Sequence, residues 1–193
     1  MHEARRTLRD ATRSHHDRVD AAFGDFDLGE RGAYTAFLSA HSAAVVPSKA
    51  MIATADLWNG WTPRSAALIA DLAELGAAPA PAMPLVPPAT TAELWGMIYV
   101  LEGSRLGGVV LAERVGPGLP RRYLESRHVD GGWRAFQAAL EAARNAGDAD
   151  WLPSAVRGAE AAFTAFETAA RLTLSLGPKG QSPGTGAGTL TEL

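Results

Sequence analysis

The stretch Glu93-Leu-Trp-Gly-Met-Ile-Tyr-Val-Leu-Glu-Gly-Ser-Arg-Leu-Gly-Gly-Val-Val-Leu-Ala-Glu-Arg-Val115 decides how the chain is organised. Its apolar residues recur at helical spacing, which predicts one buried helix. Gly103, Gly107 and Gly108 lie inside this helix, and each costs about 1 kcal/mol relative to alanine. Two explanations are open: a neighbouring helix packs tightly against the bare backbone, or a flat ligand lies against it. A bend at Gly103 is compatible with both.

The composition is that of an ordinary globular domain. The 193 residues are 47% hydrophobic and 20% charged, which is enough for one core. The net charge of -3, without a basic cluster, argues against nucleic acid or an anionic membrane as a partner. Cysteine is absent, which excludes disulfides, thiolate nucleophiles, iron–sulfur clusters and Cys-bound zinc. The first ten residues hold no apolar run, and by its sequence no segment reaches the apolar length needed to span a bilayer, so we expect a cytoplasmic protein.

The rest of the chain predicts more helices and no strand. Apolar periodicity and helix-start signals favour helices over residues 7–23, 31–46, 63–75, 133–145 and 153–176. We therefore expect an all-α fold, with a single helical domain over residues 1–176. Gly, Pro, Ser and Thr dominate residues 177–193, which are expected to form a disordered tail.

Proline and threonine predict where the helices begin and end. Pro47 should kink or break the second helix. Thr62 should cap the third helix, with Pro63 as its first residue. Residues 77–88 hold five prolines and should form an extended linker. Thr90 or Thr91 should then cap the central helix.

Histidine supplies the candidate metal ligands, at His2, His15, His16, His41 and His128. None stands in a His-Glu-x-x-His pattern, and the two Glu-x-x-His motifs of a di-iron bundle are absent, which excludes a zincin and a di-iron bundle. No Walker loop and no serine-hydrolase elbow occurs. A single histidine can still ligate a heme iron, because the porphyrin supplies the other ligands.

His15 and His16 compete for that role. His15 lies in the middle of an apolar stripe and should be buried, whereas His16 lies at its edge. Asp20, four residues after His16, shares its face and could accept a hydrogen bond from Nδ1. Such a carboxylate fixes the tautomer and makes Nε2 a better ligand. Arg9 falls on the same face and could pair with an anionic group. The alternative is a surface histidine beside a surface aspartate.

Two segments together resemble the heme oxygenases. Leu8-Arg-Asp-Ala-Thr-Arg-Ser-His-His16, followed by Asp20, resembles their proximal helix. Tyr99-Val-Leu-Glu-Gly-Ser-Arg-Leu-Gly-Gly108 resembles the glycine-rich distal helix of the bacterial branch, especially of enzymes that accompany bacterial phytochromes. The order and separation of the segments agree over residues 7–176. The resemblance implies a helical bundle that holds heme between its first helix and a kinked glycine-rich helix.

The resemblance also implies roles for individual residues. His16 falls at the iron-ligand position and Asp20 at that of its acidic partner. Gly103, Ser104 and Gly107 would form the catalytic distal side, where Ser104 replaces an aspartate that orders water near bound oxygen in the animal enzymes. The residues that would contact heme are Arg9, Asp20, Gly103, Gly107, Gly108 and Arg134, with the two arginines meeting the propionates.

The implied function is oxidative cleavage of heme to biliverdin, carbon monoxide and ferrous iron. Heme would be both substrate and cofactor, with O2 as co-substrate and no tightly bound flavin or nicotinamide. We expect a monomer that takes electrons from a ferredoxin or reductase and has a bacterial phytochrome as biliverdin client. The alternative is a non-catalytic heme carrier, sensor or scaffold on the same fold. Thiamin-degrading enzymes on a related fold are disfavoured, because they need a cysteine nucleophile.

Overall fold

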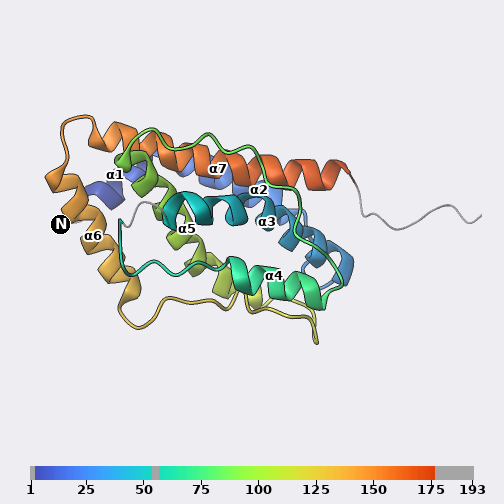
Figure 1. Cartoon of the computed structure of the whole chain (residues 1–193). Helices are drawn as coiled ribbons and strands as arrows, with labels where there is room; N and C mark the ends of the chain where they lie inside the picture. The colour runs from blue at the N-terminus through green and yellow to red at the C-terminus, as the bar shows by residue number, and fades with distance from the viewer. Residues whose placement is uncertain (1–2, 54–56, 177–193) are drawn as a thin grey trace, which may run out of the picture.

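The computed structural model describes residues 3–53 and 57–176, which form helices and connecting loops without a strand (Figure 1). The predicted all-α fold is therefore confirmed over these ranges. His2 and the tail predicted over residues 177–193 lie outside the described residues. The helices are α1 (Glu3–Ala11), α2 (Arg13–Gly24), α3 (Arg31–Ala53), α4 (Ser65–Glu74), α5 (Thr91–Ala112), α6 (Gly132–Ala146) and α7 (Trp151–Ser175).

Helix α7 is the element against which α5, α3 and α2 pack, while α4 packs on α3 and α1 on α6. Figure 1 shows α1 and α6 together at one end of the molecule. Glycines allow α5 and α7 to touch: a Cβ at Gly96 would overlap the carbonyl of Ala155, and a Cβ at Gly158 would overlap the carbonyl of Glu93. The two helices thus cross backbone to backbone near the start of α5.

The start of α5 follows its sequence signals. The Oγ1 of Thr90 accepts a hydrogen bond from the N–H of Glu93 at 3.1 Å, and the carboxylate of Glu93 accepts one from the N–H of Ala89 at 2.7 Å. The two side chains satisfy backbone donors that the first turn leaves unpaired. Thr90 is therefore the cap, one of the two residues predicted for it.

The prediction that the first helix is continuous is wrong. Instead of one helix over residues 7–23, α1 and α2 meet at Thr12, whose buried hydroxyl donates to the carbonyl of Leu8 at 2.7 Å. A threonine hydroxyl that bonds the carbonyl four residues back competes with the helical N–H and bends the helix. The bend gives α2, which carries both candidate histidines, a direction of its own.

Pro47 does not break its helix, contrary to one of the outcomes predicted for it. Helix α3 continues through Pro47 to Ala53. Proline removes the N–H that would have bonded the carbonyl of Ala43. That carbonyl instead accepts a hydrogen bond from the N–H of Met83, at 2.9 Å, in the predicted extended linker. The linker therefore supplies the donor that the helix loses.

The start predicted for the third helix is also wrong by two residues. Helix α4 begins at Ser65, preceded by Arg64, whose side chain forms no capping hydrogen bond. Thr62 and Pro63 belong to the preceding loop, so the chain turns into the helix only after Arg64. This loop brings Arg64 against α5.

Helix α5 meets the length and composition of a membrane span, contrary to the expectation that no segment would. A window of 18 of its 22 residues has a mean hydropathy of 1.2. In this fold 56% of that window is buried among the other helices, as expected for the core helix of a helical domain.

Candidate functional site

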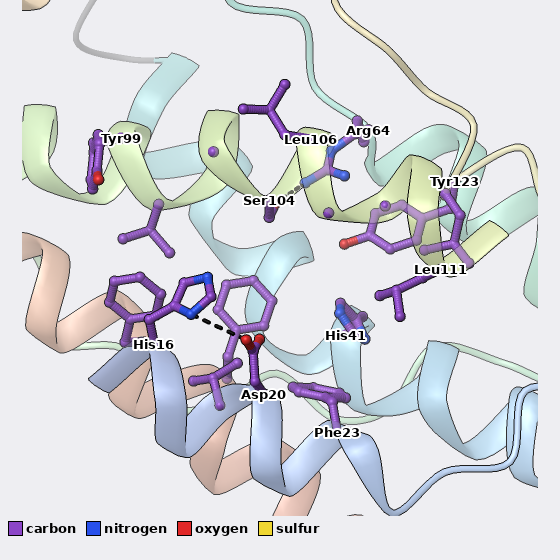
Figure 2. Close-up of a pocket in the computed structure, with 18 of the residues that line it drawn as sticks. His16, Asp20, Phe23, His41, Arg64, Tyr99, Ser104, Leu106, Leu111 and Tyr123 are labelled. Carbon is purple, nitrogen blue, oxygen red and sulfur yellow. Dashed lines mark hydrogen bonds and ion pairs between the residues drawn. The ribbon is translucent and has the colours of Figure 1, made fainter. Parts of the chain in front are cut away.

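A cavity of about 390 Å³ lies between α2 on one side and α5 on the other (Figure 2). Most of its surface is apolar. Helix α5 contributes Gly103, Ser104, Gly107 and Gly108 to one wall, and α2 contributes His16 and Asp20 to the facing one. The two segments that carry the resemblance therefore line one cavity, although 83 residues of sequence separate Asp20 from Gly103. The remaining walls include Phe37, His41, Tyr123, Trp133, Phe163 and Phe166.

His16 and Asp20 lie side by side at the edge of this cavity. The Nδ1 of His16 lies 3.2 Å from Oδ2 of Asp20, one helical turn farther along α2. Because Nδ1 faces the carboxylate, Nε2 is the ring nitrogen left free to bind a cation. The ring also contacts the edge of Phe163, with 5.9 Å between centroids. The imidazole is thus oriented as a ligand for a cation in the cavity.

His15 lies outside the residues that line the cavity. It is half-buried, as its position on the apolar stripe predicts, and its buried Nδ1 has no hydrogen-bond partner within the described chain. The pattern therefore predicted which histidine is the more buried, since His16 and Asp20 are exposed at the edge of the cavity.

Open space lies over two of the glycines that define the α5 wall. A Cβ built on Gly103 or on Gly107 would meet no heavy atom within 4 Å. At these two positions the tight helix packing considered from the sequence is absent, and the bare backbone faces the cavity. Gly108 differs, because a Cβ there would lie 2.9 Å from the carbonyl oxygen of Leu124. Gly108 thus touches both the cavity and a neighbouring loop.

Ser104 is held by hydrogen bonds within the cavity wall. Its Oγ donates to the carbonyl of Leu101 at 2.8 Å and accepts a hydrogen bond from Nη2 of Arg64. The same nitrogen of Arg64 donates to the carbonyl of Leu101 at 3.1 Å. Figure 2 shows the guanidinium of Arg64 beside Ser104 on the α5 side of the cavity. Both hydrogen-bonding capacities of the serine are therefore in use.

Arginines line the cavity at its α1 end. Only one of the two arginines predicted to contact heme is among them. Arg9 lines the cavity, half-exposed and paired with Asp10 at 3.0 Å. Arg5 lines it as well, and its Nε donates to the Gln137 side-chain oxygen at 3.1 Å, with the amide oriented to accept. Arg134 does not line this cavity; it lies on a separate depression beside His128 and Trp133. Its predicted heme contact has no support in this geometry.

His41 is a second histidine on the cavity, buried among aromatic rings. Its ring lies 4.2 Å from both Phe23 and Phe37, measured between centroids, and its Nδ1 lies 3.0 Å from the carbonyl of Phe37. Burial lowers the pKa of His41 to about 4. The imidazole is therefore neutral at pH 7, with the proton on Nδ1 and an accepting Nε2.

Arg5, Arg64 and Tyr123 line the cavity, although nothing in the sequence predicted it. His41 was predicted only as one of five candidate metal ligands. His41 had a signal, since it shares the inner stripe of its helix with Phe37. Arg64 had none, because a single arginine near the start of a helix is ordinarily exposed. No group of three or more His, Cys, Asp or Glu side chains that could hold a metal ion occurs in residues 3–53 and 57–176.

Comparisons with known proteins agree with this arrangement. The chain is 42% identical to a heme oxygenase from Xanthomonas campestris pv. campestris (strain 8004) over 119 residues, which cover 57% of this chain and 70% of that protein. The NO- and CO-bound heme oxygenase from Neisseria meningitidis superposes with a TM-score of 0.77 at 24% identity, over 94% of this chain and 97% of that one. This second likeness establishes the fold. No protein-family model matches the chain.

Proposed function

The chain belongs to the heme oxygenase family, and from that membership we propose that it cleaves heme to biliverdin, carbon monoxide and ferrous iron. The reaction consumes O2 and electrons, and we place the electron source outside this chain, in a ferredoxin or a reductase. A bacterial phytochrome is the proposed client for biliverdin. We further propose a cytoplasmic monomer whose residues 1–176 form one heme-binding domain.

The residues of the cavity fit heme. Heme is flat, largely apolar, and carries an iron and two carboxylates. A largely apolar cavity with two bare glycine positions accepts a flat apolar plate, because Gly103 and Gly107 leave more than 4 Å of space above α5. Arg5 and Arg9 supply cations at one end for the carboxylates. A single oriented imidazole supplies the iron ligand.

The observation that carries the proposal is the opposition of His16 and the Gly103–Gly107 segment across one cavity (Figure 2). His16 would hold the iron through Nε2, while Asp20 keeps the proton on Nδ1 and raises the basicity of the ring. On the opposite side, the bare backbone leaves room above the iron for a small molecule such as O2. Gly103, Ser104 and Gly107 would thus shape the side where O2 reacts.

The chemistry favours an open distal side without a strong acid or base. Heme supplies an iron that binds O2 and a porphyrin edge that is oxidised. The protein excludes bulk water with its aromatic walls and fixes which edge of the porphyrin is presented. His41 stays neutral because burial lowers its pKa to about 4, so it adds no positive charge to this cavity at pH 7.

Optical titration followed by single turnover tests the proposal. Heme added to the chain should give a Soret band that saturates at one equivalent. Ascorbate and O2 should then convert the band to a product that absorbs in the red. A Soret band that survives ascorbate and O2 unchanged identifies a heme carrier, the alternative function. Failure to bind heme would contradict both.

A further inference from the structure

Arg64 is a buried cation on the α5 side of the cavity. It precedes α4, is 6% exposed, and lines the cavity together with Gly103 and Ser104. Its guanidinium lies over the ring of Tyr123, with 4.8 Å from Cζ to the ring centroid. A guanidinium remains charged even where it is largely removed from water. Arg64 therefore brings a fixed positive charge to this wall.

Two arginines hold the loop before α4 against α5 in opposite directions. Arg64, from the loop, donates to the Leu101 carbonyl and the Ser104 hydroxyl of α5. Arg105, from α5, donates to the carbonyl of Thr62 in the loop. Arg105 is itself fixed by the carboxylate of Glu102, at 3.1 Å from Nε. Hydrogen bonds in both directions therefore hold the loop that carries Arg64 against α5 and fix the position of the guanidinium.

The hydrogen bonds of Ser104 decide which group faces a ligand. Its one proton goes to the carbonyl of Leu101, and it accepts from Arg64. A hydroxyl has one donor, so in this arrangement Ser104 keeps no proton for a molecule in the cavity. The polar hydrogens left on this side of the cavity belong to Arg64 and to the hydroxyls of Tyr99 and Tyr123, and of these groups only the guanidinium carries a charge.

The charges around the cavity leave Arg64 without a carboxylate partner. Of the described residues that line the cavity, Asp20 is the sole acid, and it lies beside His16 on the opposite wall. Glu102, on α5, is occupied by Arg105 and by His128, at 2.9 Å from Nε2. An anion beside Gly103 and Ser104 would therefore lie near the positive charge of Arg64, and Asp20, the acid on the cavity, is paired with His16 on the opposite wall.

We propose that the positive charge of Arg64 makes the α5 side of the heme cavity selective for anionic ligands over neutral ones. The inference rests on the proposed heme-binding function and adds a specificity-determining residue outside the segments that resemble the family. With an effective dielectric constant near 20, one charge at roughly 6–12 Å from a bound anion is worth about 10- to 100-fold in affinity.

The test uses the ferric heme complex of the full chain. Fluoride, an anion, and imidazole, a neutral ligand, are titrated separately and followed by absorption. Arg64→Gln should lower fluoride affinity about 10- to 100-fold while imidazole affinity stays within about threefold. Ser104→Ala is the matched control: it removes the hydroxyl but keeps the charge, so its ratio of fluoride to imidazole affinity should stay within about threefold of the parent.

An Arg64→Gln variant with the parent ratio, or with equal losses for both ligands, would overturn the inference. If that variant does not fold, Arg64→Lys decides, because it keeps the charge: retention of the parent ratio supports the inference, and loss of it in a folded heme complex overturns it. A parent chain without a Soret band would instead contradict the proposed function, so the two failures are distinguishable.

Discussion

Nδ1 of His16 lies 3.2 Å from Oδ2 of Asp20, on successive turns of α2, and both residues line the cavity, whereas His15 does not. One residue of register thus separates an imidazole that is oriented toward the cavity from one that is packed against the protein. The pair supplies an oriented nitrogen, with the carboxylate setting the tautomer.

Alanine substitution of each histidine in turn tests which one ligates the iron. His16→Ala should lose the imidazole–iron spectrum of the heme complex and its turnover, because the oriented nitrogen is gone. His15→Ala is the control; it should keep both and lose some stability, since its half-buried ring packs against the protein. Absorption spectra of the two heme complexes give the answer. The reverse pattern would assign the ligand to His15.

Removal of the carboxylate charge tests the role of Asp20. Asp20→Asn should still bind heme but weaken the bond between iron and His16, because an amide polarises the ring less than a carboxylate. Loss of such a partner typically costs about 10- to 100-fold in affinity or activity. Resonance Raman spectroscopy of the ferrous complex measures the iron–histidine stretch. An unchanged frequency would remove Asp20 from the mechanism.

Alanine substitutions at Gly107 and Gly108 distinguish a glycine that contacts the ligand from one that is needed for packing. Gly107→Ala should give an apoprotein as stable as the parent or up to about 1 kcal/mol more stable, because the added methyl meets open space. The heme complex of this variant should bind heme or activate O2 poorly. Gly108→Ala is the matched control and should lower the stability of the apoprotein by about 1–3 kcal/mol, since its Cβ would meet the carbonyl of Leu124.

Thermal melting of the apoproteins, paired with single-turnover rates, distinguishes the two cases. A Gly107→Ala apoprotein that melts well below the parent, while its folded fraction degrades heme normally, would show that Gly107 serves packing.

The charges at the α1 end predict which arginines affect heme affinity. Arg5→Glu and Arg9→Glu should each weaken heme binding about two- to tenfold, because both side chains line the cavity and are partly exposed. Arg134→Glu makes the same change of charge outside the cavity and should leave affinity unchanged. Optical titration measures all three. A loss for Arg134→Glu as large as for the other two would place the carboxylates of heme elsewhere.

His41 predicts a pH dependence of stability. The ring has a pKa of about 4 in the folded protein because it is buried, against about 6.5 when unfolded. Between these values the unfolded chain binds one more proton, so lowering the pH from 6.5 to 4 destabilises the fold by about 1.4 kcal/mol per unit from this group. In His41→Phe this contribution should vanish, while the carboxylate contributions remain. Denaturant unfolding of both apoproteins at several pH values would show parallel curves if His41 were not responsible.

The sequence predicted those parts of the fold that depend on local chemistry. The cap at Thr90, the extended linker and the helical periodicity of α5 follow from residues within one or two turns. It failed where a distant group decides. Helix α3 passes Pro47 because Met83 pairs the carbonyl of Ala43, and the break at Thr12 depends on a hydroxyl that could equally have faced solvent.

The candidate site divides in the same way. His16 and Asp20 are one turn apart, so their pairing could be predicted from spacing alone. The difference between Gly107 and Gly108 could not, because it depends on where the loop at Leu124 lies. Arg64 comes from a loop forty residues before Ser104 in the chain, and no local pattern marks it as buried.

The most direct test of heme oxygenase activity is the amount of carbon monoxide released in one turnover. The stoichiometric heme complex is reduced with ascorbate in O2, with catalase present to remove free peroxide, and carbon monoxide is trapped with ferrous myoglobin. Heme oxygenase activity with His16 as the iron ligand predicts about one carbon monoxide per heme lost, together with biliverdin, and neither product from His16→Ala. Heme that stays intact, or that bleaches without releasing carbon monoxide, would contradict it.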